Sequence, residues 1–120
     1  MNLQGTLRRL LESVEGAVGA AVGGLDGLLV EQAGSQEDLD LATVAAEHAS
    51  ILRNARAAYS RSLGAGPIIE VIVSAERLTG FTRLVNDDYF ITVALVPGGN
   101  LGRARILAER AGRELAALLP

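Results

Sequence analysis

The chain has 120 residues, of which 49% are hydrophobic and 21% charged, and a net charge of −3. This length fits one domain over residues 1–120, and the hydrophobic share excludes a disordered chain. The absence of cysteine and the single histidine exclude disulfides, thiol catalysis and zinc clusters. All 11 basic residues are arginines and form no basic block, so we expect no nucleic acid as a partner.

The N-terminal segment predicts a short amphipathic helix. Apolar residues recur at helical spacing from Leu3 to Val14. Two arginines near the start resemble a twin-arginine export signal, but Glu12 and Glu15 interrupt the stretch that should be continuously apolar. The later apolar run, residues 17–25, is too short to span a bilayer. We therefore expect a cytoplasmic protein with no membrane insertion.

The rest of the chain predicts five strands and two further helices. Turn-forming residues at Asp26-Gly27 and at 86–88 separate strands, and Asn100 is suited to cap the last helix. The expected strands are residues 17–22, 28–32, 68–74, 81–85 and 89–96, and the expected helices are residues 39–63 and the segment after Asn100. The order α-β-β-α-β-β-β-α predicts an α/β (α+β) domain with one five-stranded antiparallel sheet and helices on both faces.

The expected helix at 39–63 has more apolar surface than one sheet can cover. Its apolar arc takes up roughly half of the circumference, wider than the ~100° that a helix lying on a sheet requires. Ala42, Ala46 and Ala49 would let a second helix approach closely, so we predict a twofold homodimer with these residues at the contact. The alternative explanation for the alanines is helix propensity alone.

The apolar run at 68–74 is a second indication of self-association. Ile69, Val71 and Val73 are candidate dimer residues, because an apolar strand at a sheet edge invites pairing with another chain. An ordinary buried strand explains the same pattern nearly as well.

The element order, the hairpin around Asp26-Gly27 and the segment 100–105 that opens the last helix resemble the roadblock family of dynein light chains and bacterial small-GTPase regulators. The resemblance covers essentially the whole chain and implies a roadblock/profilin-like fold. It further implies a dimer built by the central helices and the third strand, and a small Ras-like GTPase as partner. Family members either promote GTP hydrolysis or act as scaffolds, and the sequence leaves both open.

Two arginines are candidates for contact with a GTPase. Arg53 and Arg56 lie on the stripe of the central helix that we expect to face a partner. An activator either inserts an arginine beside the transferred phosphate or presses on the switch loops of the GTPase. The alternative role for both arginines is a favourable interaction with the helix dipole.

No catalytic arrangement is apparent. His48 lacks a nucleophile on its own helix face and is expected to be a hydrogen-bonded core or interface residue. The glycine-rich segment 16–24 has no phosphate-loop pattern, so no nucleotide, metal or other cofactor is expected. The sequence therefore predicts a non-catalytic, homodimeric interaction module. A small-molecule-sensing domain or a dynein-type adaptor is the alternative.

Overall fold

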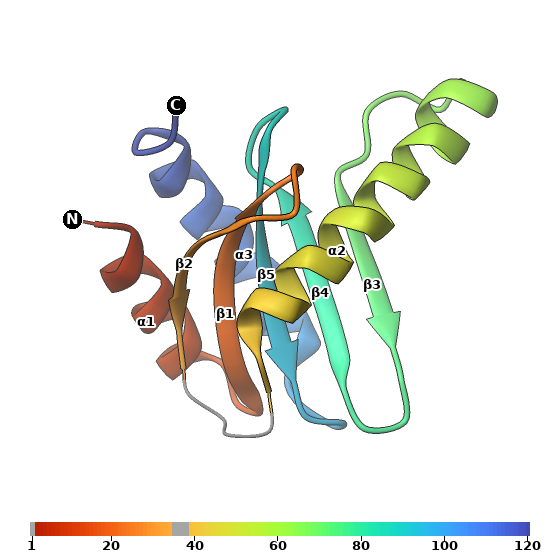
Figure 1. Cartoon of the computed structure of the whole chain (residues 1–120). Coiled ribbons are helices and arrows are strands. Elements are labelled where there is room, and N and C mark those ends of the chain that lie inside the picture. Colours follow the sequence, from red (N-terminus) through yellow and green to blue (C-terminus); the bar gives the residue numbers. More distant parts are fainter. Residues whose placement is uncertain (1, 35–38) are drawn as a thin grey trace.

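A five-stranded antiparallel sheet lies between two helical layers in the computed structural model, which describes residues 2–34 and 39–120 (Figure 1). The helices are α1 (Leu3–Ser13), α2 (Leu41–Ala55), the π-helix η1 (Arg56–Ser62) and α3 (Leu101–Ala116). The strands are β1 (Ala17–Gly24), β2 (Leu29–Ala33), β3 (Glu70–Ser74), β4 (Thr79–Leu84) and β5 (Tyr89–Leu95). Their order across the sheet is β2-β1-β5-β4-β3, so β2 and β3 are the edges. The predicted element order and fold class are confirmed.

Helices α1 and α3 cover one face of the sheet and α2 crosses the other, as predicted (Figure 1). No described helix is both long enough and apolar enough to span a bilayer. Polar side chains set the helix starts: Asp40 Oδ1 accepts from the Ala42 amide at 3.0 Å, and Asn100 Oδ1 accepts from the Arg103 amide at 3.0 Å. The predicted cap at Asn100 is therefore confirmed.

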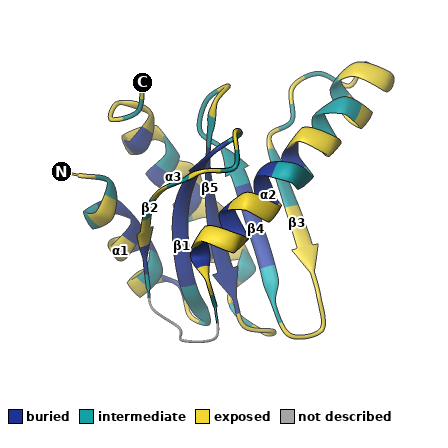
Figure 2. Cartoon of the chain, viewed as in Figure 1, coloured by how far each residue is buried: buried dark blue, intermediate teal, exposed yellow. Residues whose placement is uncertain are grey.

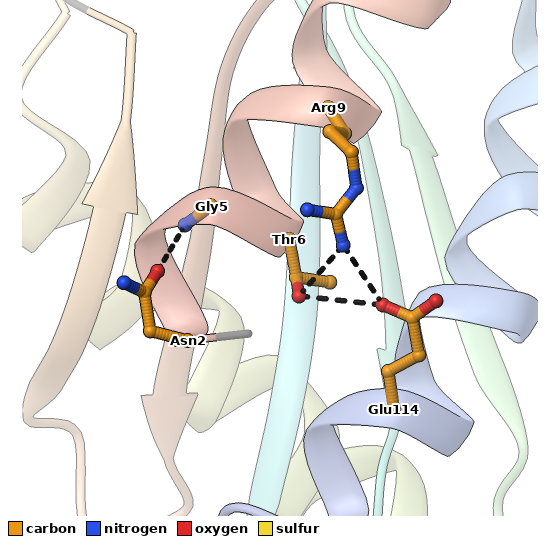
Figure 3. A network of polar contacts seen from close by, with 5 residues as sticks. All are labelled: Asn2, Gly5, Thr6, Arg9 and Glu114. Carbon is orange, nitrogen blue, oxygen red and sulfur yellow. Dashed lines mark hydrogen bonds and ion pairs between the residues drawn. The ribbon is translucent and has the colours of Figure 1, made fainter.

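The larger core lies between the sheet and the helix pair α1 and α3. It includes fully buried Leu7, Phe81 and Leu115. At the surface of this layer Arg9 of α1 pairs with Glu114 of α3 at 3.1 Å, and the Thr6 hydroxyl lies 3.3 Å from the same carboxylate (Figure 3). Because both charged side chains are exposed, this network adds little to the stability that the apolar core provides.

The smaller core lies under α2, where small residues allow the helix to approach the sheet closely. A Cβ at Gly19 of β1 would lie 2.7 Å from Leu41 Cδ2, and one at Gly23 would lie 2.6 Å from Phe90 Cζ. Ala49 is fully buried in this core beside Phe90. Ala49 therefore offers no exposed surface in the single chain, and its place at a dimer contact stays a prediction. Its small side chain serves the close fit of α2 on its own sheet.

The central helix changes its winding before it ends. The predicted helix 39–63 is α-helical to Ala55 and then forms η1, in which the Leu63 amide donates to the Ala58 carbonyl, five residues earlier, at 3.0 Å. The pattern of apolar residues follows the buried half of the helix and carries no information on hydrogen-bond spacing at the exposed end. η1 extends past the sheet in Figure 1.

Candidate functional site

Strand β3 is an apolar edge with one uncovered side. It pairs with β4 without a register shift, and Val73 lies opposite Gly80. Ile69 is 62% exposed, Ile72 39% and Val73 38%, and β3 is the most exposed strand of the sheet in Figure 2. Of the two predicted environments, edge or buried, the structure shows the edge. An apolar edge with free backbone groups is a surface suited to pairing with another strand.

The contacts of α2 show which of its sides faces β3. Ala49 lies beside Phe90 of β5, whereas the His48 ring lies over Gly80 and Thr82 of β4, one strand nearer to β3. An α-helix turns about 100° per residue, so Ile51 lies about 60° further round than His48, in the direction away from Ala49. The half-buried Ile51 side chain therefore points toward the β3 side of the helix.

The opposite side of α2 faces the β1–β2 hairpin. The Arg53 guanidinium donates to the carbonyl oxygen of Leu25 in that hairpin. Ala42 and Ala46 are exposed and share this side of the helix with Arg53. They are accessible, as a dimer contact requires, but they lie on the shoulder turned away from β3. A contact of Ala42 and Ala46 with a second chain stays a prediction.

Arg53 and Arg56 both tie the end of the central helix to turns of the sheet. Arg56 Nη2 donates to the carbonyl oxygen of Asp87 in the β4–β5 turn at 3.5 Å. Within residues 2–34 and 39–120, neither arginine forms an ion pair with a carboxylate. The predicted GTPase contacts thus lie beside the two turns, on a surface distinct from the β3 edge.

His48 anchors α2 to the sheet through a buried polar cluster, as a hydrogen-bonded core residue. Its Nδ1 lies 2.5 Å from Thr82 Oγ1, which lies 2.9 Å from Thr92 Oγ1 on β5. Burial lowers the pKa of His48 below its ordinary value, and the neighbouring Glu47 carboxylate offsets part of this effect. A Cβ at Gly80 would lie 2.6 Å from the ring, so only glycine leaves room for it.

Sequence reasoning missed Gly80, Thr82 and Thr92. Each looks ordinary in the sequence, and only the pairing of Thr82 with Thr92 across β4 and β5 brings their hydroxyl groups together beneath His48. The signal that was available is the lone histidine on an apolar helix face, because a buried imidazole needs a polar partner.

Comparisons with known proteins agree with this architecture. A Roadblock/LC7 domain from Streptomyces avermitilis is 17% identical, with 98% of both chains covered and a TM-score of 0.87. MglC from Myxococcus xanthus is 33% identical over 96% of this chain and 97% of that one, with a TM-score of 0.68. MglB from Myxococcus xanthus is 16% identical over 96% and 92%, with a TM-score of 0.84. A search of curated protein sequences found no match to the chain.

The likenesses below 25% identity concern the fold, and they extend to profilin II from Acanthamoeba castellanii, which is 16% identical over 93% of this chain and 98% of that one, with a TM-score of 0.53. The model of the Roadblock/LC7 domain matches residues 3–95, from the first helix to the end of the last strand. Because this match spans the sheet and the central helix, the chain belongs to the Roadblock/LC7 family, as its sequence resemblance predicts.

Proposed function

We propose that this chain is a non-catalytic interaction module that forms a homodimer and binds a small Ras-like GTPase. The observation that carries the proposal is the uncovered apolar edge at β3, flanked by the Ile51 shoulder of α2. A lone protomer would leave these side chains in water beside unpaired backbone groups. Membership of the Roadblock/LC7 family supports the same assembly.

In the proposed dimer two β3 strands pair antiparallel across a twofold axis, which joins the two sheets. A twofold interface uses the same patch on both chains, so the dimer interface contains two copies of Val73 and two of Ile51. Val73 lies on the α2 face of β3, because it is opposite Gly80, the residue beneath His48. The strand and the helix shoulder therefore offer one continuous surface to the second copy. Ala42 and Ala46 form a separate exposed surface for a further contact.

The GTPase partner rests on the family. The roadblock resemblance implies small Ras-like GTPases, and the 33% identity to MglC indicates a bacterial member of this family. Arg53 and Arg56 hold the two turns that border the exposed end of the central helix. Because Arg53 already donates to a carbonyl of its own chain, this arrangement favours support of the turns and pressure on the switch loops over insertion of an arginine beside the phosphate.

A binding experiment tests the partner. The purified protein is mixed with Ras-like GTPases loaded with GTP or GDP, and co-elution and phosphate release are measured. We expect nucleotide-dependent co-elution, with faster phosphate release for an activator and unchanged release for a scaffold. Failure to bind any GTPase in either nucleotide state would refute the GTPase assignment and favour a sensing or dynein-adaptor role.

Light scattering tests the dimer separately. A homodimer has twice the 12.5 kDa mass of the chain. A single-chain mass at micromolar concentration would show that the β3 edge stays uncovered.

A further inference from the structure

An open cavity lies at the exposed end of the central helix, beside the segment that leads into β3. Its volume is about 420 Å³, and it opens to solvent between η1, the connection to β3 and the β4–β5 turn. The cavity is lined by Arg56, Ser60, Arg61, Gly66, Pro67 and Asp87. Two of the six lining residues carry a guanidinium group.

The π-helical winding brings the two arginines together. In an α-helix, residues five apart point about 140° away from each other. In a π-helix the backbone hydrogen bond joins residues five apart, and the wider turn brings these residues closer to the same side of the helix. Arg56 and Arg61 are the first and sixth residues of η1, and both line the same cavity. The unusual winding therefore has a local consequence, which is a pair of guanidinium groups on one side of the helix.

The cavity walls are held by hydrogen bonds within the chain. The Ser60 hydroxyl donates to the Gly66 carbonyl at 2.6 Å, and the Ala65 amide donates to the Tyr59 carbonyl at 2.8 Å. Arg56 Nη2 reaches the third wall through a long hydrogen bond of 3.5 Å to the Asp87 carbonyl oxygen. A preformed site loses little conformational entropy when a ligand binds.

The charges of the lining define the ligand. Two guanidinium groups and the Asp87 carboxylate leave the cavity one positive charge in excess. Arg61 forms no side-chain hydrogen bond or ion pair with any residue in the described part of the chain. Its planar fork can bind the two oxygens of a carboxylate, and the nearby Asp87 disfavours a doubly charged phosphate more than a singly charged carboxylate.

We propose that this cavity binds one carboxylate group, supplied by an aspartate or glutamate side chain of the protein partner. The site itself follows from the geometry of this chain, and only the source of the carboxylate rests on the proposed function. The Arg61 guanidinium is free to bind the carboxylate, whereas the Arg56 guanidinium also donates to a carbonyl of the β4–β5 turn.

A titration with acetate tests the site without any partner. Two-dimensional NMR spectra of the full chain are recorded with acetate, with inorganic phosphate and with chloride at equal ionic strength. We expect saturable shifts with acetate at the amides of residues 60–66 and 87. Arg61→Gln should weaken acetate binding about tenfold, the value of one charge-assisted hydrogen bond, while leaving the Arg56 bond and the fold intact. Arg8→Gln, a change of an exposed arginine on α1, should leave it unchanged.

Three results would overturn the site: shifts that do not saturate, equal acetate binding by Arg61→Gln, or tighter binding of phosphate than of acetate. The same two variants are then tested for GTPase binding. Loss of binding in Arg61→Gln but not in Arg8→Gln supports a partner carboxylate in the cavity, and equal binding by both refutes that source. If the parent protein binds acetate but no GTPase, the proposed function fails while the carboxylate site stands.

Discussion

The two edge strands of this sheet differ in how well they are suited to pair with another chain. Both contain five residues, but β2 carries Glu31 and pairs with β1 across a register shift at Val22 and Gly23. β3 pairs regularly with β4, and its central residues Val71 to Val73 carry no charge. A bulge and a charge are the usual devices that stop an edge from pairing with another chain. β2 has both, and the centre of β3 has neither.

This difference shows that an exposed apolar side chain indicates a pairing surface only when the geometry of its strand also allows pairing. Val30 of β2 is 41% exposed and Val73 of β3 is 38% exposed, so burial alone does not separate the two edges. Regular pairing keeps the outer backbone groups of β3 in the alignment that a further strand needs, whereas the bulge twists β2 out of it. Among the described residues, β3 is therefore the edge better suited to pairing with a further strand.

A matched pair of substitutions tests this comparison and has the largest expected effect. Val73→Asp places a like charge on both chains at the proposed interface, and we expect the dimer dissociation constant to rise at least about 100-fold, or about 2.7 kcal/mol. Val30→Asp introduces the same charge at equal exposure on β2 and should leave the dimer unchanged. Analytical ultracentrifugation over a concentration series measures both. Equal weakening by the two variants, or no effect of Val73→Asp, would contradict the assignment of β3.

A second pair distinguishes the two shoulders of α2. Ile51→Glu brings a charge to the side that faces β3, and we expect about 30-fold weaker dimerisation, because the carboxylate loses water at the interface. Ala46→Glu changes the shoulder on the hairpin side and should have little effect. The same sedimentation series applies. If Ala46→Glu weakens the dimer and Ile51→Glu does not, the small-residue surface of Ala42 and Ala46 is the contact instead.

The fold was predictable because its elements have strong local signals. The turns at Asp26-Gly27 and 86–88 and the cap at Asn100 lie where the structure has them. Each signal depends on a few neighbouring residues. Element ends were less certain, as for β3, which begins at Glu70 rather than Ile68.

The candidate site was less predictable, because it depends on rotation about α2 and on strand order. The stripe of Ala42, Ala46 and Ala49 is continuous in the sequence, yet the sheet takes Ala49 and leaves the other two exposed. Periodicity measures how wide an apolar arc is but not how it is divided between the sheet and a partner. The pairing of Arg56 with Arg61 likewise depends on π-helical winding, which apolar spacing does not encode.

The fit of α2 beside the β3 edge gives a third, smaller prediction. In Gly80→Ala the new Cβ would lie 2.6 Å from the His48 ring, so the ring and the helix must shift. We expect a loss of about 1.5 kcal/mol in the free energy of unfolding, typical of overpacking. Gly102→Ala is the control, because Gly102 lies in the first turn of α3 with its nearest neighbour 3.8 Å from the added Cβ, and it should be neutral or slightly stabilising. Urea denaturation at one protein concentration measures both, and equal stability of Gly80→Ala and the parent would refute the tight fit.

His48 gives the smallest effect, a dependence of stability on pH. Burial lowers its pKa in the folded chain below 6.5, and Glu47 is the charged neighbour that offsets part of this effect, since Gly80, Thr82 and Thr92 carry no charge. As pH falls through 6.5 the unfolded chain binds the proton first, so the free energy of unfolding decreases from there down toward the folded pKa. We expect a loss of up to about 1 kcal/mol between pH 7.5 and 5.5 in urea denaturation. His48 is the only histidine, and His48→Asn keeps a polar atom near Thr82 without titrating, so the loss should disappear in this variant. An equal loss in His48→Asn would assign the pH dependence to other groups, and a flat profile in the parent would show that protonated His48 is accommodated beside Thr82 without cost.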